Sequence, residues 1–497
     1  MVEIDPLNLL PEIALLLGAV VALLGGSFTP RERQWIIRLV AVVALLVAAG
    51  ASVVALAGTA MSLLDDTYAV DVPTGVARLV IALATLLVVV LGTGELAGTP
   101  RESESYALLL LAALGATVLA GTTDLILLII AFMVSSIPLY ALIGLNRSRG
   151  AAEAAMKTYL FGALFGILLM LGVTLLLGMA GTTRYAGLAD GAAAAPAVVV
   201  AVGAVAVLGG LLFKAGGVPG HFWVPDATQG SGVVGAAFLT TVPKIGALVA
   251  IYRLVEALPP VADWPLLVAV LATASMTLGN LAAFWQNDPR RLLGWSTVSQ
   301  VGYLLLPVAV AGRSEFALPS LLLYLTGYAV TNLAAFAVVA AEPGRTELAG
   351  YRGLASRRPW LAGSLLVALL GLVGTPPTVV FVGKLTTFTA AWNGGLAWLV
   401  VVAAVNTVAS LFYYLRWIAP VFSRVAAPAP AGATGTGSAA AGATGTGSAA
   451  ADEADVAGER VPGWRAATGA AIAAAGLSVA LGLGAGLLWA ALTGLGS

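Results

Sequence analysis

Apolar stretches of about 20 residues recur along almost the whole chain. A stretch of that length is what a helix needs to cross the hydrocarbon core of a bilayer. The composition agrees, because 60% of the 497 residues are hydrophobic and only 10% are charged. The sequence therefore predicts an all-α, polytopic membrane protein of about 14 transmembrane helices. The expected spans are 9–26, 36–58, 76–93, 106–121, 124–146, 155–180, 196–215, 232–255, 264–285, 292–311, 316–341, 359–390, 393–423 and 466–494.

Metal-binding side chains are scarce. The chain has no Cys and a single His, His221, so it cannot ligate an iron-sulfur cluster through cysteines or build a His/Cys zinc site. We expect no cofactor and no metal in this chain, and any redox chemistry would belong to partner proteins. The formal net charge of +0 argues against a nucleic-acid partner.

Arginines are distributed unevenly between the predicted loops. Sixteen lie in or beside odd-numbered loops and four lie in or beside even-numbered loops. Because cytoplasmic loops carry the excess of basic residues, the odd-numbered loops are expected in the cytoplasm. Both termini are then expected on the outer side of the membrane.

All four lysines of the chain lie within predicted spans, whereas the other twenty basic residues are arginines. An ionisable residue inside a membrane marks a protein interior or a water-filled path, and a buried lysine can release its proton while an arginine cannot. We interpret the four lysines as proton carriers. The alternative is that lysine fits tight helix packing and reaches toward the interface. This alternative has most weight for Lys157, because Glu153 precedes it by one helical turn as a partner. The lysines are Lys157, Lys214, Lys244 and Lys384.

Two predicted spans are interrupted by glycine and proline beside a lysine. Broken helices at membrane depth are tolerated where they line a cavity or pack on protein, and transporters place ion sites at such breaks in two corresponding halves. The spacing of five spans between the interruptions therefore predicts paired repeats. The interrupting residues are Gly216, Gly217, Pro219 and Gly220 after Lys214, and Gly374, Pro376, Pro377 and Gly383 before Lys384.

Residues 213–248 carry the most specific motif, FKAGGVPGHFWVPDATQG followed by AAFLTTVPKIGAL. Further motifs are SSIPLYALIGL, EAAMK, GNLAAFWQNDPRRLLGWSTVSQVGY and GTPPTVVFVGKLTTF. Together they resemble the antiporter-like membrane subunits of respiratory complex I, the bacterial NADH-quinone oxidoreductase. The Trp-x-Pro-Asp element, Trp223 to Asp226, is most similar to the subunit N family.

The resemblance implies a division into two inverted five-helix repeats with broken helices 7 and 12. The predicted loop before the last span stands apart, because AGATGTGSAA occurs there twice in tandem and low-complexity sequence of this kind builds no core. The expected units are 1–104 with helices 1–3, 105–255 as the first repeat with helices 4–8, 264–423 as the second repeat with helices 9–13, 424–462 as a flexible cytoplasmic loop, and 463–497 with helix 14.

The resemblance also implies a function. The chain would be a proton-translocating subunit of a translocase in the bacterial cell (inner) membrane, in contact with lipid and with related antiporter-like subunits. NADH, FMN, iron-sulfur clusters and quinone would be bound by those partners. The Ala-, Gly- and Arg-rich composition is typical of high-GC bacteria, many of which use menaquinone. Proton transfer would fall to Lys214, Lys244, Lys384 and Lys157, with His221 as a relay.

One departure from the family pattern concerns the fifth span. Met133 stands where the family usually has a glutamate that pairs with the lysine equivalent to Lys214. We therefore expect Lys214 to contact no carboxylate and to lie near hydroxyls such as Ser135 and Ser136. Glu153 is the surrogate carboxylate that the sequence favours.

Two other functions remain open from the sequence. The chain could be a subunit of a multi-component cation/proton antiporter with the same fold, or a scaffold whose lysines are inert. Met133 and the Trp-x-Pro-Asp element weigh against the antiporter, because that reading expects the carboxylate. The scaffold leaves the placement of the four lysines unexplained.

Overall fold

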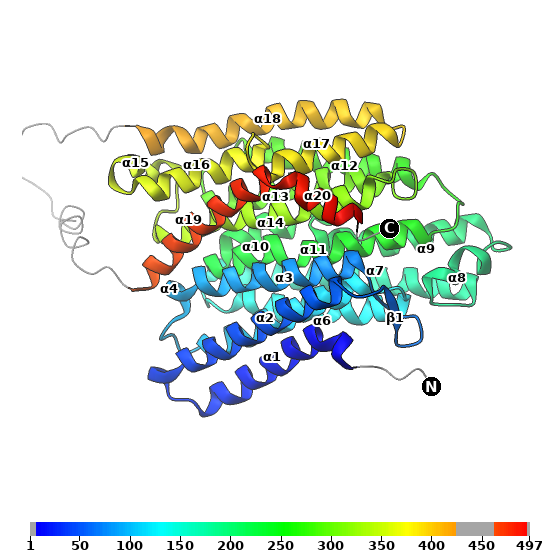
Figure 1. Ribbon diagram of the computed structural model, residues 1–497, viewed down its shortest axis with the longest axis horizontal. Helices are drawn as coiled ribbons and strands as arrows, with labels where there is room; N and C mark the ends of the chain where they lie inside the picture. Colours follow the sequence, from blue (N-terminus) through cyan, green and yellow to red (C-terminus); the bar gives the residue numbers. More distant parts are fainter. Residues whose placement is uncertain (1–5, 424–461, 495–497) are drawn as a thin grey trace, which may run out of the picture.

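A computed structural model describes residues 6–423 and 462–494 of the chain. The expected flexible loop before the last span lies outside the described residues, and so do the chain ends, whose side of the membrane the arginine count predicts. Within the described ranges the chain forms long helices that run roughly alongside one another (Figure 1).

The helices up to the middle of the chain are α1 (Leu10–Phe28), α2 (Trp35–Leu56), α3 (Val72–Leu91), α4 (Thr93–Leu96), α5 (Glu102–Gly121), α6 (Leu125–Gly144), α7 (Arg149–Ala180), α8 (Tyr185–Gly191), α9 (Ala197–Ala215), α10 (Trp223–Gly230) and α11 (Val233–Ala257). The later ones are α12 (Trp264–Ala283), α13 (Pro289–Ala309), α14 (Ala317–Ala341), α15 (Leu354–Arg357), α16 (Pro359–Val373), α17 (Val379–Asn393), α18 (Ala397–Phe422), α19 (Pro462–Leu483) and α20 (Ala485–Gly494). Short 3-10 helices are η1 (Pro6–Leu9), η2 (Arg31–Arg33) and η3 (Leu348–Tyr351), and β1 (Met61–Leu63) pairs antiparallel with β2 (Tyr68–Val70).

Thirteen helices in the described ranges are long and apolar enough to cross a membrane. The remaining expected span, 359–390, is divided into α16 and α17. This confirms the prediction of a polytopic, all-α membrane protein. Some boundaries differ from the expected ones: α7 begins six residues before 155, at Arg149, and the last span is divided at Gly484.

Several spans begin at a side chain that caps the helix. The first backbone N–H groups of a helix have no partner within it, and an Asp or Ser oxygen satisfies them. Asp124, for example, accepts hydrogen bonds from the backbone N–H groups of Ile126 and Leu127 at the start of α6. The capping residues are Asp71, Asp124, Ser148, Asp263 and Asp288.

The hairpin in the second loop was not expected from the sequence. It places Tyr68 beside a buried ion pair between α1 and α3, because the Tyr68 hydroxyl donates to Glu12 Oε1 at 2.7 Å and Arg78 Nε lies 2.7 Å from the same oxygen. Two charged side chains that are buried away from water must pair with each other and have their remaining polar atoms hydrogen-bonded. The hairpin thereby fixes the end of the first three spans.

The centre of the bundle is formed by α11, α13 and α14. In the apolar 18-residue segment of each of these helices, 89 to 100% of the residues are buried. In Figure 1 these three helices lie between the early spans and α16 to α18. The penultimate helix, α19, packs against α3, α14, α16 and α17. It therefore joins segments that are far apart in the sequence.

Glycine permits two close helix contacts near the centre. A side chain at Gly115 on α5 would collide with the backbone of Ser135 on α6, and one at Gly246 on α11 would collide with the carbonyl of Ala116. Helix α5 therefore packs tightly between α6 and α11. Helix α6 contacts Lys214 and helix α11 contains Lys244, as described below.

Candidate functional site

The first helix break separates α9 from α10. Gly216 ends α9 in a left-handed conformation with φ +79°, which glycine adopts without steric cost. The break leaves carbonyl groups of the last turn without helical partners. Trp223, the first residue of α10, donates its indole N–H to one of them, Phe213 O, at 3.0 Å.

Lys214 lies in the last turn of α9, two residues before Gly216, and is buried, with 1% of its surface exposed. Its ammonium group donates to the Ser136 hydroxyl on α6 at 3.0 Å and lies 5.9 Å from the centre of the Phe132 ring. Within the two described ranges, no carboxylate oxygen lies within 4.0 Å of Lys214 Nζ. The predicted hydroxyl contact at Ser136 is confirmed.

Met133 stands where the family usually has a glutamate, and Glu153 is the carboxylate that the sequence favours as its replacement. Met133 is one turn from Ser136 on α6, and its methyl group faces Gly166 of α7. Glu153 does not contact Lys214. It pairs with Lys157 at 2.6 Å, and 66% of its side chain is exposed. The structure therefore does not bear out Glu153 as the carboxylate partner of Lys214, and the pairing present is the one that the one-turn spacing predicts.

Lys244 is fully buried in the middle of α11. Its ammonium group has no hydrogen-bond partner among the described residues, and it lies 4.8 Å from the centre of the Trp223 ring. Gly216 is also adjacent, because a side chain there would lie 3.3 Å from Lys244 Nζ. Lys244 therefore faces the first helix break.

Lys214 and Lys244 interact electrostatically. Both lie at the first helix break, so a positive charge on one repels a positive charge on the other. In a protein interior with an effective dielectric constant near 20, two unit charges about 10 Å apart interact by roughly 1.7 kcal/mol. A proton on one of these lysines thus disfavours a proton on the other.

The second break separates α16 from α17 and has the same construction. Gly374 ends α16 with φ +92°. Lys384, buried on α17, reaches back across the break and donates to Val373 O at 2.9 Å and Leu372 O at 3.4 Å. It also lies 3.9 Å from the centre of the Tyr303 ring. The lysine therefore satisfies carbonyl groups that the break removes from the helix.

Polar side chains begin a connection between Lys244 and the second break. Thr240 and Thr241 precede Lys244 by about one turn and share its face of α11. Asn332 on α14 donates to both hydroxyls, at 3.0 and 2.9 Å. The Tyr328 hydroxyl, also on α14, lies 2.7 Å from Thr240 O.

The same face of α14 continues the connection to Lys384. The Tyr324 hydroxyl donates to Gln300 Oε1 at 2.5 Å. Gln300 Nε2 in turn donates to Leu372 O at 2.8 Å, which is one of the two carbonyls that Lys384 contacts. Two hydrogen-bonded groups of polar residues thus lie in the buried centre, one a turn from Lys244 and the other at the carbonyl that Lys384 contacts.

These connecting residues were missed in the sequence. A signal was present, because Tyr324, Tyr328 and Asn332 recur every four residues and so share one face of a helix. The recurrence indicates a polar stripe on α14. It does not indicate which residues of α11 and α13 meet that stripe.

His221 lies in the loop between α9 and α10. It is buried, and its Nδ1 has no hydrogen-bond partner among the described residues. Its ring centre lies 4.3 Å from that of Phe222 and 5.8 Å from that of Trp295. Its role as a relay stays a prediction.

Lys157 is placed apart from the other three lysines. Its side chain is 43% exposed, and it pairs with Asp226 at 3.0 Å as well as with Glu153. The other oxygen of Asp226 accepts from Arg291 at 2.7 Å. Asp226 thus links α7, α10 and α13 through two ion pairs.

No cluster of three or more metal-ligating His, Cys, Asp or Glu side chains occurs in the described ranges.

A protein-family model, "NADH:quinone oxidoreductase/Mrp antiporter, TM", matches residues 122–410. NADH-quinone oxidoreductase subunit N of Mycobacterium sp. (strain JLS) is 56% identical over 419 residues, which are 84% of this chain and 89% of that protein. Subunit N 1 of Streptomyces griseus is 52% identical over 423 residues, 85% of this chain and 89% of that protein.

Solved structures from multi-subunit assemblies have the same fold. A chain of respiratory complex I from Thermus thermophilus with bound aureothin matches with a TM-score of 0.79 and 31% identity, covering 97% of this chain and 99% of that one. A chain of the Mrp complex from Dietzia sp. DQ12-45-1b matches with a TM-score of 0.82 and 25% identity, covering 100% and 97%. The motifs, the two helix breaks and these likenesses agree, and the chain belongs to the family of NADH-quinone oxidoreductase and Mrp antiporter membrane subunits, within its subunit N group.

Proposed function

We propose that this chain translocates protons in the membrane part of an NADH-quinone oxidoreductase, with Lys214, Lys244 and Lys384 as the groups that take up and release them. The observation that carries the proposal is the placement of these lysines. Each is buried, none forms an ion pair with a described carboxylate, and two lie at the helix breaks. Burial without a counter-ion is costly for a charge, so proton release from these side chains costs little.

The mechanism follows from electrostatic coupling. A proton that arrives on Lys214 repels the proton on Lys244. This repulsion favours transfer of the Lys244 proton onward to Lys384. The hydroxyl and amide groups on α13 and α14 supply polar positions along the way. Because arginine does not release its proton, only lysine serves at these three positions.

We assign Lys157 a different part. Two carboxylates hold its ammonium group at a half-exposed site, and opposite charges favour the protonated form. Its ion pair with Asp226 fixes α10, which follows the first break. Lys157 is therefore a positioning residue in this proposal.

The chain organisation that supports this function is two repeats of five spans. The similar construction of the breaks at Gly216 and Gly374 supports the repeat boundaries 105–255 and 264–423. We assign the odd-numbered loops to the cytoplasm and both termini to the outer side of the bacterial inner membrane. Partner subunits would supply NADH, FMN, iron-sulfur clusters and a quinone, with menaquinone as the expected one.

An antiporter subunit is the second candidate. The TM-score of 0.82 to the Dietzia Mrp chain favours it. Sequence identity favours the oxidoreductase, with 56% to the mycobacterial subunit N against 25% to the Mrp chain. Copurification of this chain with FMN-containing subunits supports the oxidoreductase, and copurification with antiporter subunits alone refutes it.

Exchange of each buried lysine for arginine tests the carrier role. Lys214→Arg, Lys244→Arg and Lys384→Arg are expected to abolish most NADH-driven proton uptake into inverted membrane vesicles, and the corresponding alanine variants should do the same. Assembly, measured by native gel electrophoresis, should change much less. The matched comparison is Lys157→Arg, which preserves the ion pairs and should retain most proton uptake. Wild-type uptake in the three buried variants would refute the carrier role.

A further inference from the structure

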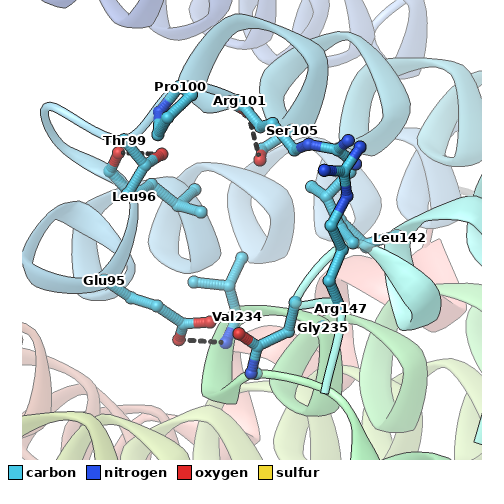
Figure 2. Close-up of a pocket in the computed structure, with 13 residues that line it drawn as sticks. Glu95, Leu96, Thr99, Pro100, Arg101, Ser105, Leu142, Arg147, Val234 and Gly235 are labelled. Carbon is cyan, nitrogen blue, oxygen red and sulfur yellow. Dashed lines mark hydrogen bonds between the residues drawn. The ribbon is translucent and has the colours of Figure 1, made fainter. Parts of the chain in front are cut away.

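A pocket of about 320 Å³ opens at one end of the bundle, away from the lysines. Figure 2 shows it between the turn that leads from α4 to α5, the end of α6 and the start of α11. It is lined by Glu95, Leu96, Arg101, Leu142, Arg147 and Val234, among others. Polar and apolar side chains both contribute to this lining.

The two arginines of this pocket have no anionic partner in the part of the chain that the structure describes. Neither side chain forms a hydrogen bond or an ion pair with a described residue. Figure 2 shows Arg101 and Arg147 pointing toward one another at the same side of the pocket. Two guanidinium groups repel each other, and an anion placed between them would remove the repulsion.

The backbone at Arg147 is held in an unfavourable conformation. Its φ of +52° is in the left-handed region, which costs an L-residue other than Gly, Asn or Asp some strain. The turn between α6 and α7 nevertheless keeps this arginine over the pocket. A ligand that pairs with Arg147 would compensate for that strain.

The carboxylate in the pocket lies on the opposite side. Glu95 Oε2 accepts from the backbone N–H of Val234 at 3.1 Å, at the N-terminus of α11, where the helix dipole favours negative charge. Figure 2 shows Glu95 across the pocket from the two arginines. An anion at the arginine side therefore does not displace it.

The pocket lies at the ends of membrane-spanning helices, where a bilayer has its lipid headgroups. Arg101 directly precedes α5 and Arg147 lies in the turn before α7, so both mark the ends of membrane spans. Leu142 provides apolar surface beside them, and Leu96 lies on the side of Glu95 (Figure 2). Basic pockets between the ends of transmembrane helices bind the headgroups of anionic lipids.

We propose that this pocket binds the phosphate group of an anionic phospholipid through Arg101 and Arg147. Phosphate matches the forked donors of arginine, and the neighbouring leucines accommodate the start of an acyl chain. Soluble phosphate offers the arginines the same charged oxygens as a phospholipid headgroup. We infer the lipid because the pocket lies at the ends of the membrane spans.

A photo-crosslinker placed at Leu145, which also lines the pocket, tests the proposal on the assembled complex. The complex is reconstituted in nanodiscs of phosphatidylcholine with a minor fraction of alkyne-labelled phosphatidylglycerol. We expect a crosslink to phosphatidylglycerol that falls about tenfold or more in the double variant Arg101→Gln/Arg147→Gln. The control is Arg33→Gln/Arg149→Gln, which removes the same charge from exposed positions outside the pocket and should crosslink like the wild type.

Four results would overturn the proposal. Labelled phosphatidylcholine that crosslinks as strongly as phosphatidylglycerol would show acyl-chain filling without headgroup recognition. Loss of the crosslink in millimolar inorganic phosphate would assign the pocket to soluble phosphate. A crosslink to another subunit, or to a peptide from residues 424–461, would assign the arginines to a protein carboxylate. An unchanged crosslink in the double variant would exclude the arginines as ligands.

Discussion

Lys244 Nζ lies 4.8 Å from the centre of the Trp223 ring, and the indole N–H of the same ring donates to Phe213 O at the helix break. One side chain therefore supports the lysine and the broken helix together. A ring face stabilises a desolvated cation by about 2 kcal/mol. The hydrogen bond, by comparison, contributes about 1 kcal/mol.

Substitution of Trp223 separates the two contributions. Trp223→Phe keeps a ring near Lys244 but removes the hydrogen bond, whereas Trp223→Leu removes both. We expect proton uptake per NADH oxidised to fall moderately in the first variant and severely in the second. Equal losses in both variants would show that the hydrogen bond to Phe213 matters and the ring contact does not.

Gly374 is the residue on which the geometry of the second break depends. In Gly374→Ala, an alanine at φ +92° costs about 1 to 2 kcal/mol, and its Cβ would lie 2.9 Å from Lys384 Cδ. We expect a lower thermal midpoint of the assembly and reduced proton uptake. The control is Gly363→Ala on α16, where the added Cβ meets nothing within 4 Å and stability should be unchanged or slightly higher.

The ion pair between Asp71 and Arg253 should make stability depend on pH. Burial by itself raises the pKa of the Asp71 carboxyl. The Arg253 charge, with hydrogen bonds from Arg253 and Thr74, more than offsets this and places the pKa below its ordinary value. Because the folded-state pKa is lowered, the stabilisation is present above the unfolded pKa of about 4 and is lost as the pH falls through the folded value.

The corresponding variant is Asp71→Asn, which should lower the free energy of unfolding by about 1 to 2 kcal/mol at pH 7. Thermal unfolding of the purified assembly, followed from pH 7 to below pH 4, measures the difference. It should shrink in acid, where Asp71 of the wild type also becomes neutral. The exposed Asp65→Asn serves as the control, and a difference that stays constant with pH would contradict this explanation.

A carboxylate restored at position 133 should change how Lys214 works. Met133 is one turn from Ser136, whose hydroxyl contacts Lys214 Nζ, so a glutamate there has the reach to pair with the lysine. An opposite charge favours the protonated form of a lysine. We expect Met133→Glu to alter the pH dependence of NADH-driven proton uptake, and Met133→Gln to leave it unchanged. Identical pH profiles for all three proteins would place the side chain at 133 out of reach of Lys214.

Features that depend on local sequence were predictable. The spans follow from the length of the apolar runs. The two breaks follow from the glycine and proline residues that begin at Gly216 and at Gly374. The contact of Lys214 with Ser136 was also foreseen, because Met133 indicated a site without its usual carboxylate. The spans and breaks need only the chemistry of one segment, whereas the contact between α9 and α6 was expected from the family resemblance.

Features that depend on which helices meet were not predictable. Gln300 and Tyr324 lie on different helices, and nothing in either segment indicates that they share a hydrogen bond. Likewise, Arg101 and Arg147 belong to loops that each look like an ordinary basic turn. Their convergence on one pocket arises from the packing of α4, α5, α6 and α11, which no single segment encodes.

Helix α19 has a consequence for how the chain is made. It closes an apolar seam between α3 and α14, and its Ser478 hydroxyl lies 2.7 Å from that of Thr331. Because synthesis runs from the N-terminus, α3 and α14 are inserted long before residues 462–483 leave the ribosome. The seam stays open to lipid until then. A transcript truncated after residue 423 would encode every buried lysine and both breaks, yet leave the faces of α3 and α14 that α19 covers exposed to lipid.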